Sequence, residues 1–189
     1  MRPVVKLAIV LAIPFLPASA APPRHASPVV RRPAASPIAI SEKDIKNFAQ
    51  VAPGIWRGAA PTREGLEKLR ALGVRQVVDL RIERKGQEAE AAACRELGLE
   101  RERIRMGREA PTRKQVAQFL ALCDRSGKAP LFIHCQHGAD RTGAMVGIYR
   151  VTRQGWDYAR ARAEMRKYGF KPWLHELEQS VRGRVGKRG

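Results

Sequence analysis

The sequence predicts an α/β domain with a central, mostly parallel sheet of about four to five strands flanked by helices. Two observations carry this prediction. Segments rich in β-branched residues alternate with segments whose apolar residues recur at helical spacing. In addition, residues 130–134 (PLFIH) are continuously apolar, which is typical of a central strand covered on both faces. In such a fold we expect a ligand site at the carboxyl ends of the strands.

Four segments favour strands. Residues 54–61 (GIWRGAAP) form a short candidate, and 74–80 (VRQVVDL) are rich in β-branched side chains. Residues 99–106 (LERERIRM) alternate more weakly between apolar and charged side chains. The apolar segment 130–134 completes the set as the central strand.

Five segments favour helices, and they follow these strands in turn. The first begins after Thr62 and ends at Gly73, and the second covers the alanine-rich residues 87–97. The third has the strongest signal, a Thr112–Gln115 capping box followed by apolar residues at i, i+3, i+4 and i+7: Val116, Phe119, Leu120 and Cys123. The last two cover 141–154, which is apolar on most sides and therefore buried, and 156–168.

Composition divides the chain into four parts. Residues 1–20 have the pattern of a cleavable signal peptide, because basic residues precede LAIVLAIPFL and the small residues ASA follow. An uncleaved membrane anchor is the alternative, although this stretch is short for a bilayer and holds a proline. Residues 21–40 form a Pro/Ala-rich spacer, 41–175 the folded domain, and 176–189 a basic C-terminal tail. We expect export to the periplasm or secretion.

The charge favours anionic partners. The chain carries a formal net charge of +18, or about +16 without the two basic residues of the signal peptide. The basic residues are scattered, so we expect no binding of nucleic acid, whereas an anionic membrane surface and phosphorylated substrates remain open. We expect a monomer. Cys94 and Cys123 lie on predicted helix faces made of core residues. We expect free buried thiols there, with a disulfide as the alternative in an exported protein.

The segment LFIHCQHGADRTG, residues 131–143, combines groups that bind an anion. Cys135 follows the central strand, a loop leads to Arg141, and a helix begins around Thr142. Backbone N–H groups and the positive helix end would converge on one point, where the Arg141 fork can grip two phosphate oxygens. The same field favours the thiolate form of Cys135, which makes it a nucleophile.

Each neighbour of Cys135 has a predicted role in this loop. We expect the phosphate to contact the loop residues Gln136, His137, Gly138, Ala139, Asp140 and Arg141. The Thr142 hydroxyl can donate to the sulfur, and His134 can orient the loop from behind. A metal held by His134, Cys135 and His137 would lack a further ligand motif, so no metal is expected. An inert buried thiol would leave the glycine, arginine and threonine unexplained, and a loop that binds phosphate without turnover stays open.

The loop HCQHGADRTG resembles the Cys-x5-Arg signature of the cysteine-dependent protein tyrosine phosphatase superfamily. With VDLR and RGAAP upstream, the chain is similar, over roughly 50–170, to the compact dual-specificity-like phosphatases of bacteria. The resemblance implies a dual-specificity phosphatase-like fold and hydrolysis of phosphate monoesters without a cofactor. Cys135 would attack phosphorus, Arg141 would hold the phosphoryl oxygens, and water would hydrolyse the phosphocysteine. Substrates would be phosphotyrosine, phosphoserine or phosphothreonine proteins, or phosphoinositides and inositol phosphates.

The sequence departs from this family at the general acid. The loop 106–112 (MGREAPT), where relatives usually place an aspartate, holds Glu109 as its one carboxylate. Asp140 is the favoured alternative, because it resembles the DRT ending of the loop in phosphoinositide phosphatases such as the myotubularins and the Sac family. Its competing role is to fix Arg141.

Four further residues have weaker assignments. Arg57 and Arg81 follow strand candidates, and we expect them to add positive charge at the rim of the site. Trp173 and His175 follow the last predicted helix and are interpreted mainly as packing residues.

Overall fold

The computed structural model describes residues 38–186. The predicted signal peptide and residues 21–37 of the spacer lie outside this range. The strands are β1 (Ala49–Ala52), β2 (Ile55–Ala59), β3 (Gln76–Asp79), β4 (Glu100–Arg103) and β5 (Leu131–Cys135). The helices are α1 (Arg63–Ala71), α2 (Gln87–Glu96), α3 (Arg113–Asp124), α4 (Asp140–Arg153), α5 (Tyr158–Lys167) and α6 (His175–Arg182). Within residues 38–186 no helix has the length and apolar character needed to cross a bilayer.

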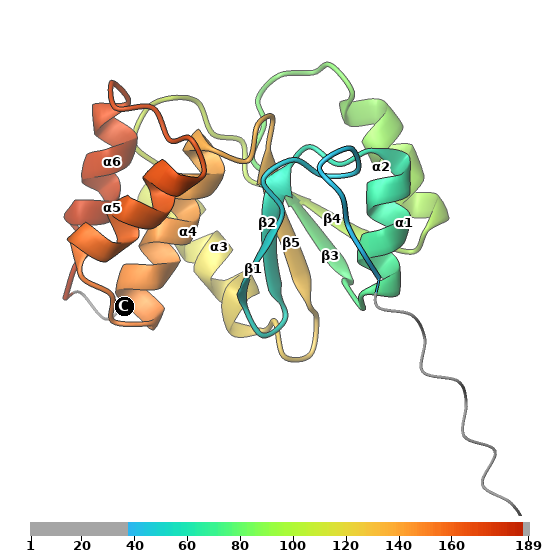
Figure 1. The fold of residues 1–189 in the computed structure, drawn as a ribbon, viewed down its shortest axis with the longest axis horizontal. Coiled ribbons are helices and arrows are strands. Elements are labelled where there is room, and N and C mark those ends of the chain that lie inside the picture. The colour runs from blue at the N-terminus through green and yellow to red at the C-terminus, as the bar shows by residue number, and fades with distance from the viewer. Residues whose placement is uncertain (1–37, 187–189) are drawn as a thin grey trace, which may run out of the picture. The chain divides into compact units, whose positions relative to one another are not determined.

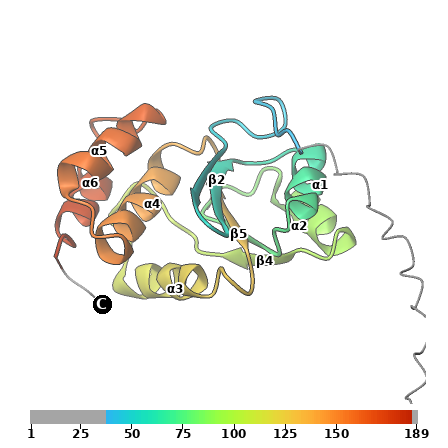
Figure 2. The same ribbon diagram turned by 60° about the horizontal axis from the view of Figure 1, so that its bottom comes forward.

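The strands form one sheet in the order β1-β2-β5-β3-β4. The β2–β5, β5–β3 and β3–β4 pairs are parallel, and β1 runs antiparallel to β2. Helices α1 and α2 cover one face of the sheet and α3 to α6 the other (Figures 1 and 2). The predicted fold class is therefore confirmed.

The central strand β5 is buried along its whole length. Its side chains alternate between two cores: Leu131, Ile133 and Cys135 pack with α3, α4 and the later helices, whereas Phe132 packs with α1 and α2. Cys135 lies opposite Ala59 of β2, and His134 lies opposite Asp79 of β3. The carboxyl ends of three parallel strands therefore meet beside Cys135.

The predicted caps and buried thiols are confirmed. The Thr62 hydroxyl accepts a hydrogen bond from the Gly65 N–H at the start of α1. The Thr112–Gln115 capping box is present at the start of α3. Cys94 and Cys123 are free and buried.

Two elements were missed, and one of them corrects the predicted domain boundary. Strand β1 is short and partly exposed, so its four residues carry no clear alternation. The predicted tail 176–189 is wrong as a segment outside the domain, because α6 begins at His175 and its Leu177 and Val181 are fully buried in the larger core. Only two apolar positions among charged neighbours mark this helix, which is a weak helical signal.

The packing of α6 leads to a stability prediction. A Cβ added at Gly147 of α4 would lie 3.1 Å from a methyl carbon of Val181, so α6 sits directly against α4. Val181→Ala removes two buried methyl groups and leaves a cavity, and we expect the free energy of unfolding to fall by roughly 2 kcal/mol. Urea unfolding followed by circular dichroism measures this. Val185→Ala, at a position 41% exposed, is the matched control and should change little; equal effects of the two variants would refute the assignment of α6 to the core.

Candidate functional site

Cys135 is the last residue of β5, and its side chain is buried. Residues 136–139 form the connection to α4, called here the phosphate loop, and α4 begins at Asp140. No side chain caps this helix, so the N–H groups of its first turn lack the intrahelical acceptors that later turns have. The positive end of a 14-residue helix therefore lies beside Cys135, as the sequence predicts.

The phosphate loop is held by its carbonyl groups. The Ala60 N–H donates to the Gln136 carbonyl at 3.4 Å, and the Asn47 side-chain amide donates to the His137 carbonyl at 2.9 Å. Nη2 of Arg57 donates to the Gly138 carbonyl at 2.6 Å. These bonds tie the loop to β2 and to the segment before β1. In a trans peptide the N–H points away from the carbonyl, so holding the carbonyls favours N–H groups on the opposite side of the loop.

Gly138 is required at its position for two reasons. Its φ of +68° belongs to the left-handed region. A Cβ there would also lie 2.5 Å from the backbone of Gly58 and Ala59 in β2. Only a residue without a side chain allows the loop to approach the strand this closely.

The Arg141 guanidinium is held in place by a paired carboxylate. Its Nη1 and Nη2 donate to the two oxygens of Glu83 at 2.9 and 3.0 Å, and Nη1 also lies 3.3 Å from the Met106 carbonyl. Burial opposes the charged form, but Glu83 and the neighbouring Cys135 outweigh it and raise the pKa of Arg141. The pKa of Glu83 is lowered by the same contact with Arg141. Arg141 is therefore a permanent, oriented cation at the site.

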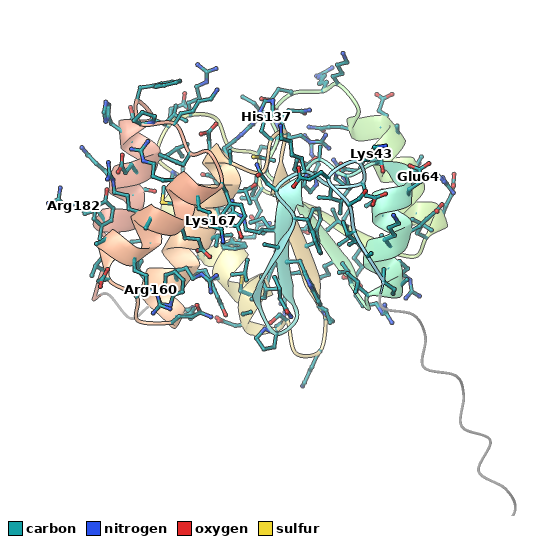
Figure 3. All side chains as sticks on the ribbon, in the orientation of Figure 1. Lys43, Glu64, His137, Arg160, Lys167 and Arg182 are labelled. Atoms are coloured by element: carbon teal, nitrogen blue, oxygen red, sulfur yellow. The ribbon has the colours of Figure 1, made fainter. Side chains whose placement is uncertain are left out.

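A pocket of about 330 Å³ opens over the phosphate loop. Figure 3 labels His137 at the upper end of the sheet, where this loop connects β5 to α4. The pocket is lined by Gln136 and His137 of the loop and by Asp140 and Arg141 of α4. Gly107 to Glu109, which precede α3, form a second wall. Ile82 and Trp173 are 44% and 63% exposed at its edge, so the interpretation of Trp173 as mainly a packing residue is wrong.

Both candidate general acids line this pocket. Asp140 is half-buried, and its Oδ1 accepts a hydrogen bond from the Lys171 N–H at 2.9 Å. Glu109 is exposed, on a segment attached to α6 by a hydrogen bond from the Ala110 N–H to the Glu176 carboxylate. The Thr142 hydroxyl is fully buried and has no hydrogen-bond partner within residues 38–186.

Arg57 and Arg81 do not lie at the rim, so this prediction is wrong. Arg57 is 1% exposed and lies beneath the phosphate loop, and Arg81 is 3% exposed within a cluster of charged residues. The two residues were expected at the rim because they were taken to follow strands. Both side chains instead point inward, where each finds polar partners under the site.

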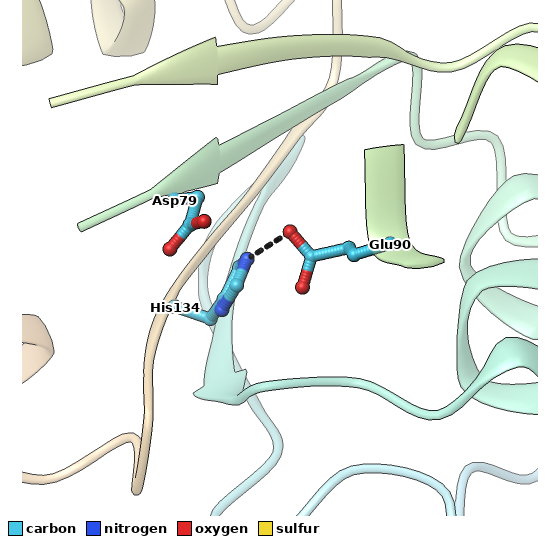
Figure 4. Close-up of side chains that lie close together, drawn as sticks. All are labelled: Asp79, Glu90 and His134. Carbon is cyan, nitrogen blue, oxygen red and sulfur yellow. Dashed lines mark ion pairs between the residues drawn. The ribbon is translucent and has the colours of Figure 1, made fainter. Parts of the chain in front are cut away.

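The cluster around Arg81 connects β3, β4 and α2 behind Cys135. Arg81 and Arg101 each bind both Asp79 and Glu90, with N–O distances from 2.5 to 2.9 Å. His134 Nε2 lies 3.4 Å from Glu90, as Figure 4 shows. His134 Nδ1 lies 3.4 Å from the Cys135 carbonyl, which is consistent with its predicted role behind the loop.

Three residues of this cluster carry groups that can bind a metal ion. Side-chain ligand atoms of Asp79, Glu90 and His134 lie within 4.8 Å of one another. Every carboxylate oxygen, however, already accepts from Arg81 or Arg101. The guanidinium groups of Arg81 and Arg101 already neutralise these two carboxylates. The cluster is therefore an ion-pair network, and its residues do not fit a metal ion.

Residues 29–183 match the family model described as the DSP-PTPase phosphatase fused to NAD+ kinase. The chain belongs to this family. Dual specificity protein phosphatase TpbA from two strains of Pseudomonas aeruginosa is 31% and 32% identical over 124 residues. The match covers 66% of this chain and 55% of TpbA, so the chain spans about half the length of that relative.

Solved structures share the fold of this family member. The core catalytic domain of the PP-IP phosphatase SIW14 from S. cerevisiae, in complex with citrate, superposes with a TM-score of 0.65 at 23% identity, covering 73% of this chain and 85% of that one. TpbA from P. aeruginosa in complex with phosphotyrosine gives 0.64 at 23% identity, covering 79% and 92%. At this identity the likeness shows the fold alone.

Sequence reasoning missed two residues that shape the site, Asn47 and Glu83. Asn47 lies 90 residues from His137, whose carbonyl it holds, and Glu83 lies 58 residues from Arg141. Neither belongs to a motif, and one sequence gives no sign of such distant pairs. The left-handed φ of Asn47, +57°, is common for asparagine but has no sequence signature of its own.

Glu90 provides a test of the cluster behind Cys135. Burial would raise its pKa, but His134 and Arg81 outweigh burial and lower it below the ordinary 4.5. We expect Glu90→Gln to reduce the free energy of unfolding at neutral pH by about 3 kcal/mol, because two buried guanidinium groups lose a charged partner. A carboxylate with a lowered pKa stabilises the fold above its unfolded pKa and loses this effect in acid. The difference from wild type should therefore shrink as the pH falls below 4.5.

Urea unfolding at a series of pH values makes this measurement. Glu88→Gln, an exposed carboxylate on the same helix, is the matched control and should leave stability nearly unchanged. A constant deficit of Glu90→Gln down to the acid limit would show that the charge of Glu90 is not the cause.

Proposed function

We propose that this protein hydrolyses phosphate monoesters through a phosphocysteine intermediate. One observation carries the proposal: Cys135 ends β5 at the phosphate loop, and Arg141, in the first turn of α4, lines the pocket over this loop, with its pKa raised by Glu83 and Cys135. The thiolate attacks phosphorus and displaces the alcohol oxygen, which takes a proton from a general acid. Water then attacks phosphorus, releasing phosphate and the thiolate. Arg141 and the loop N–H groups stabilise the charge on the phosphoryl oxygens in both steps.

We assign the general acid to Asp140, with Glu109 as the alternative. Asp140 precedes Arg141 directly and is fixed by the Lys171 N–H at the edge of the pocket. Glu109 lies on an exposed segment and would need that segment to close over the substrate. The buried Thr142 hydroxyl is free to donate to the sulfur when it leaves the phosphocysteine.

A phosphorylated protein is the first proposed substrate. TpbA is named a dual specificity protein phosphatase. The exposed side chains of Ile82 and Trp173 give the pocket apolar walls that suit the ring of phosphotyrosine.

Inositol phosphates and phosphoinositides form the second candidate class. Arg108 and Lys171 line the same pocket and favour substrates with several phosphates, and SIW14 is named a PP-IP phosphatase. A lipid substrate would bring this face to an anionic membrane surface, where Trp173 can insert. Export through residues 1–20 remains part of the proposal.

Cys135→Ser tests the proposed reaction against a phosphate-binding module without turnover. Wild type, kept reduced, should hydrolyse members of a panel of a phosphotyrosine peptide, a phosphothreonine peptide, phosphoinositides and inositol hexakisphosphate. The serine variant should lose at least about a thousandfold in kcat, because its hydroxyl is not ionised at neutral pH. Phosphate release is the readout, and the ranking of rates identifies the substrate class. Wild type that binds vanadate but hydrolyses none of the panel would contradict the proposal.

Gly138→Ala tests the close approach of the phosphate loop to β2. The added Cβ must displace the loop, and we expect kcat/KM to fall on the order of a hundredfold while the fold is retained. Gly155→Ala is the matched control, since Gly155 has nearly the same φ, +67°, with no atom within 4 Å of the added Cβ. It should keep wild-type activity. Equal activity losses in the two variants would point to backbone strain in general.

A second pair of variants distinguishes Asp140 from Glu109 as the general acid. Asp140→Asn should lower kcat by about a hundredfold or more for an alkyl phosphate and much less for an aryl phosphate with a good leaving group. Glu109→Gln should leave both rates nearly unchanged. Stopped-assay phosphate release measures both, and the reverse pattern would transfer the role to Glu109.

A further inference from the structure

Arg57 is a buried charge without an ion pair. It lies in the middle of β2 and is 1% exposed. No carboxylate within residues 38–186 is close enough to form a salt bridge with it, and its Nε and Nη1 have no hydrogen-bond partner there. Its contacts are the Gly138 carbonyl, at 2.6 Å, and the ring of Tyr168, 3.9 Å from the guanidinium carbon. Burying an unpaired charge is costly, so its retention calls for a physical reason.

Cys135 is one of the groups whose negative charge acts on Arg57. Burial lowers the pKa of Arg57 to about 10, so it stays protonated at neutral pH. The charged and titratable groups that face it are Glu164 of α5, Tyr168 after α5, Arg150 of α4, and Cys135. Two N–H groups of Arg150 donate to the Glu164 carboxylate, so the charges of Arg150 and Glu164 compensate each other. Tyr168 offers its ring face. Cys135 adds a smaller attraction than Glu164 does, and it lies on the same face of the sheet as Arg57, because Arg57 pairs with Ile133, two residues before Cys135.

We propose that Arg57 is a positioning residue that acts on Cys135 from behind the phosphate loop. Its Nη2 fixes the Gly138 carbonyl, which keeps the loop N–H groups facing the pocket. Its positive charge, beneath the loop and away from solvent, stabilises the thiolate of Cys135 and the phosphoryl group above it. Arg141 holds the substrate from the pocket side, whereas Arg57 does not touch the substrate.

Only the expected effect of Arg57 on catalysis rests on the proposed function. The stabilisation of the thiolate is a property of the free protein and can be measured without any substrate. Iodoacetamide reacts only with the thiolate, so the rate of Cys135 alkylation across pH measures the fraction of thiolate. Mass spectrometry of the Cys135 peptide follows this rate. Cys94 and Cys123 serve as internal standards, since burial raises the pKa of both thiols, to about 11 for Cys94.

Arg57→Met removes the charge and keeps an apolar side chain of similar length. We expect alkylation of Cys135 below neutral pH to slow by about tenfold or more, and the alkylation profile to move to higher pH. The acid side of the kcat/KM profile for an aryl phosphate should move with it. Arg57→Lys retains the charge and should recover most of the alkylation rate, although it loses the guanidinium fork that holds Gly138.

Arg150→Met combined with Glu164→Gln is the matched control, because it removes this ion pair without leaving a free carboxylate beside Arg57. Arg150 is also a buried arginine, 7% exposed, that lies over an aromatic ring, 4.2 Å from the centroid of Trp156, and donates to a backbone carbonyl. The double variant should lower the melting temperature at least as much as Arg57→Met without moving the alkylation profile of Cys135.

Three results would overturn the proposal. A folded Arg57→Met variant with the wild-type alkylation profile would show that the charge does not act on Cys135. An equal shift in the Arg150→Met/Glu164→Gln control would make the effect one of general destabilisation. Unfolding of both Arg57 variants would assign the residue to the fold instead. A wild type that alkylates readily at Cys135 but hydrolyses no phosphate ester would refute the proposed function and leave this inference standing.

Discussion

The close approach of the phosphate loop to β2 is the constraint on which the site depends. At Gly138 the loop backbone lies so near Gly58 and Ala59 that no side chain fits between them. Gly58 is itself confined, because a Cβ there would lie 2.5 Å from a methyl carbon of Ile45. Two glycines therefore allow strand, loop and core to pack together. The contact turns loop carbonyls toward the strand, and this gives the opposite side of the loop its capacity to bind an anion.

The charges around Cys135 are arranged in layers. Arg141 lies at the pocket with Glu83 as its partner, and Arg57 lies beneath the loop without a carboxylate. Behind both, the cluster of Asp79, Glu90, Arg81 and Arg101 balances two positive with two negative charges and closes the end of the sheet. A buried network of this kind contributes little net stability but fixes geometry once all its members are present. The unbalanced positive charge is thus concentrated where an anionic sulfur and a phosphoryl group are proposed to lie.

The sequence predicts most of the fold because its strongest signals are local. The continuous apolar run of β5, the capping box of α3 and the loop after Cys135 each lie within a few residues. The strand and the capping box have the expected structure, and the loop leads to a helix as expected, although α4 begins at Asp140, two residues before the predicted start. Helix α6 escaped prediction because its burial depends on a partner surface on α4. Periodicity within eight residues cannot reveal that surface.

The wrong predictions for Arg57 and Arg81 also arise from contacts between distant parts of the chain. Arg57 and Arg81 were predicted at the rim because both were taken to follow a strand, whereas Arg57 lies in the middle of β2. Exceptions to such sequence rules occur at functional sites. Their burial depends on Tyr168 for the first and on Glu90 for the second, contacts that form only when the chain is folded. Asn47 and Glu83 belong to this group too, since each holds a residue far along the chain.

The central claim is that Cys135, positioned by this loop, becomes covalently bonded to phosphorus during turnover. Rapid acid quenching of the wild-type protein with a labelled aryl phosphate, followed by peptide mapping, tests it most directly. The account predicts a phosphoryl group on the peptide that contains Cys135, formed in a burst before steady-state phosphate release. Turnover with no labelled cysteine at any quench time, or with the label on another residue, would contradict it.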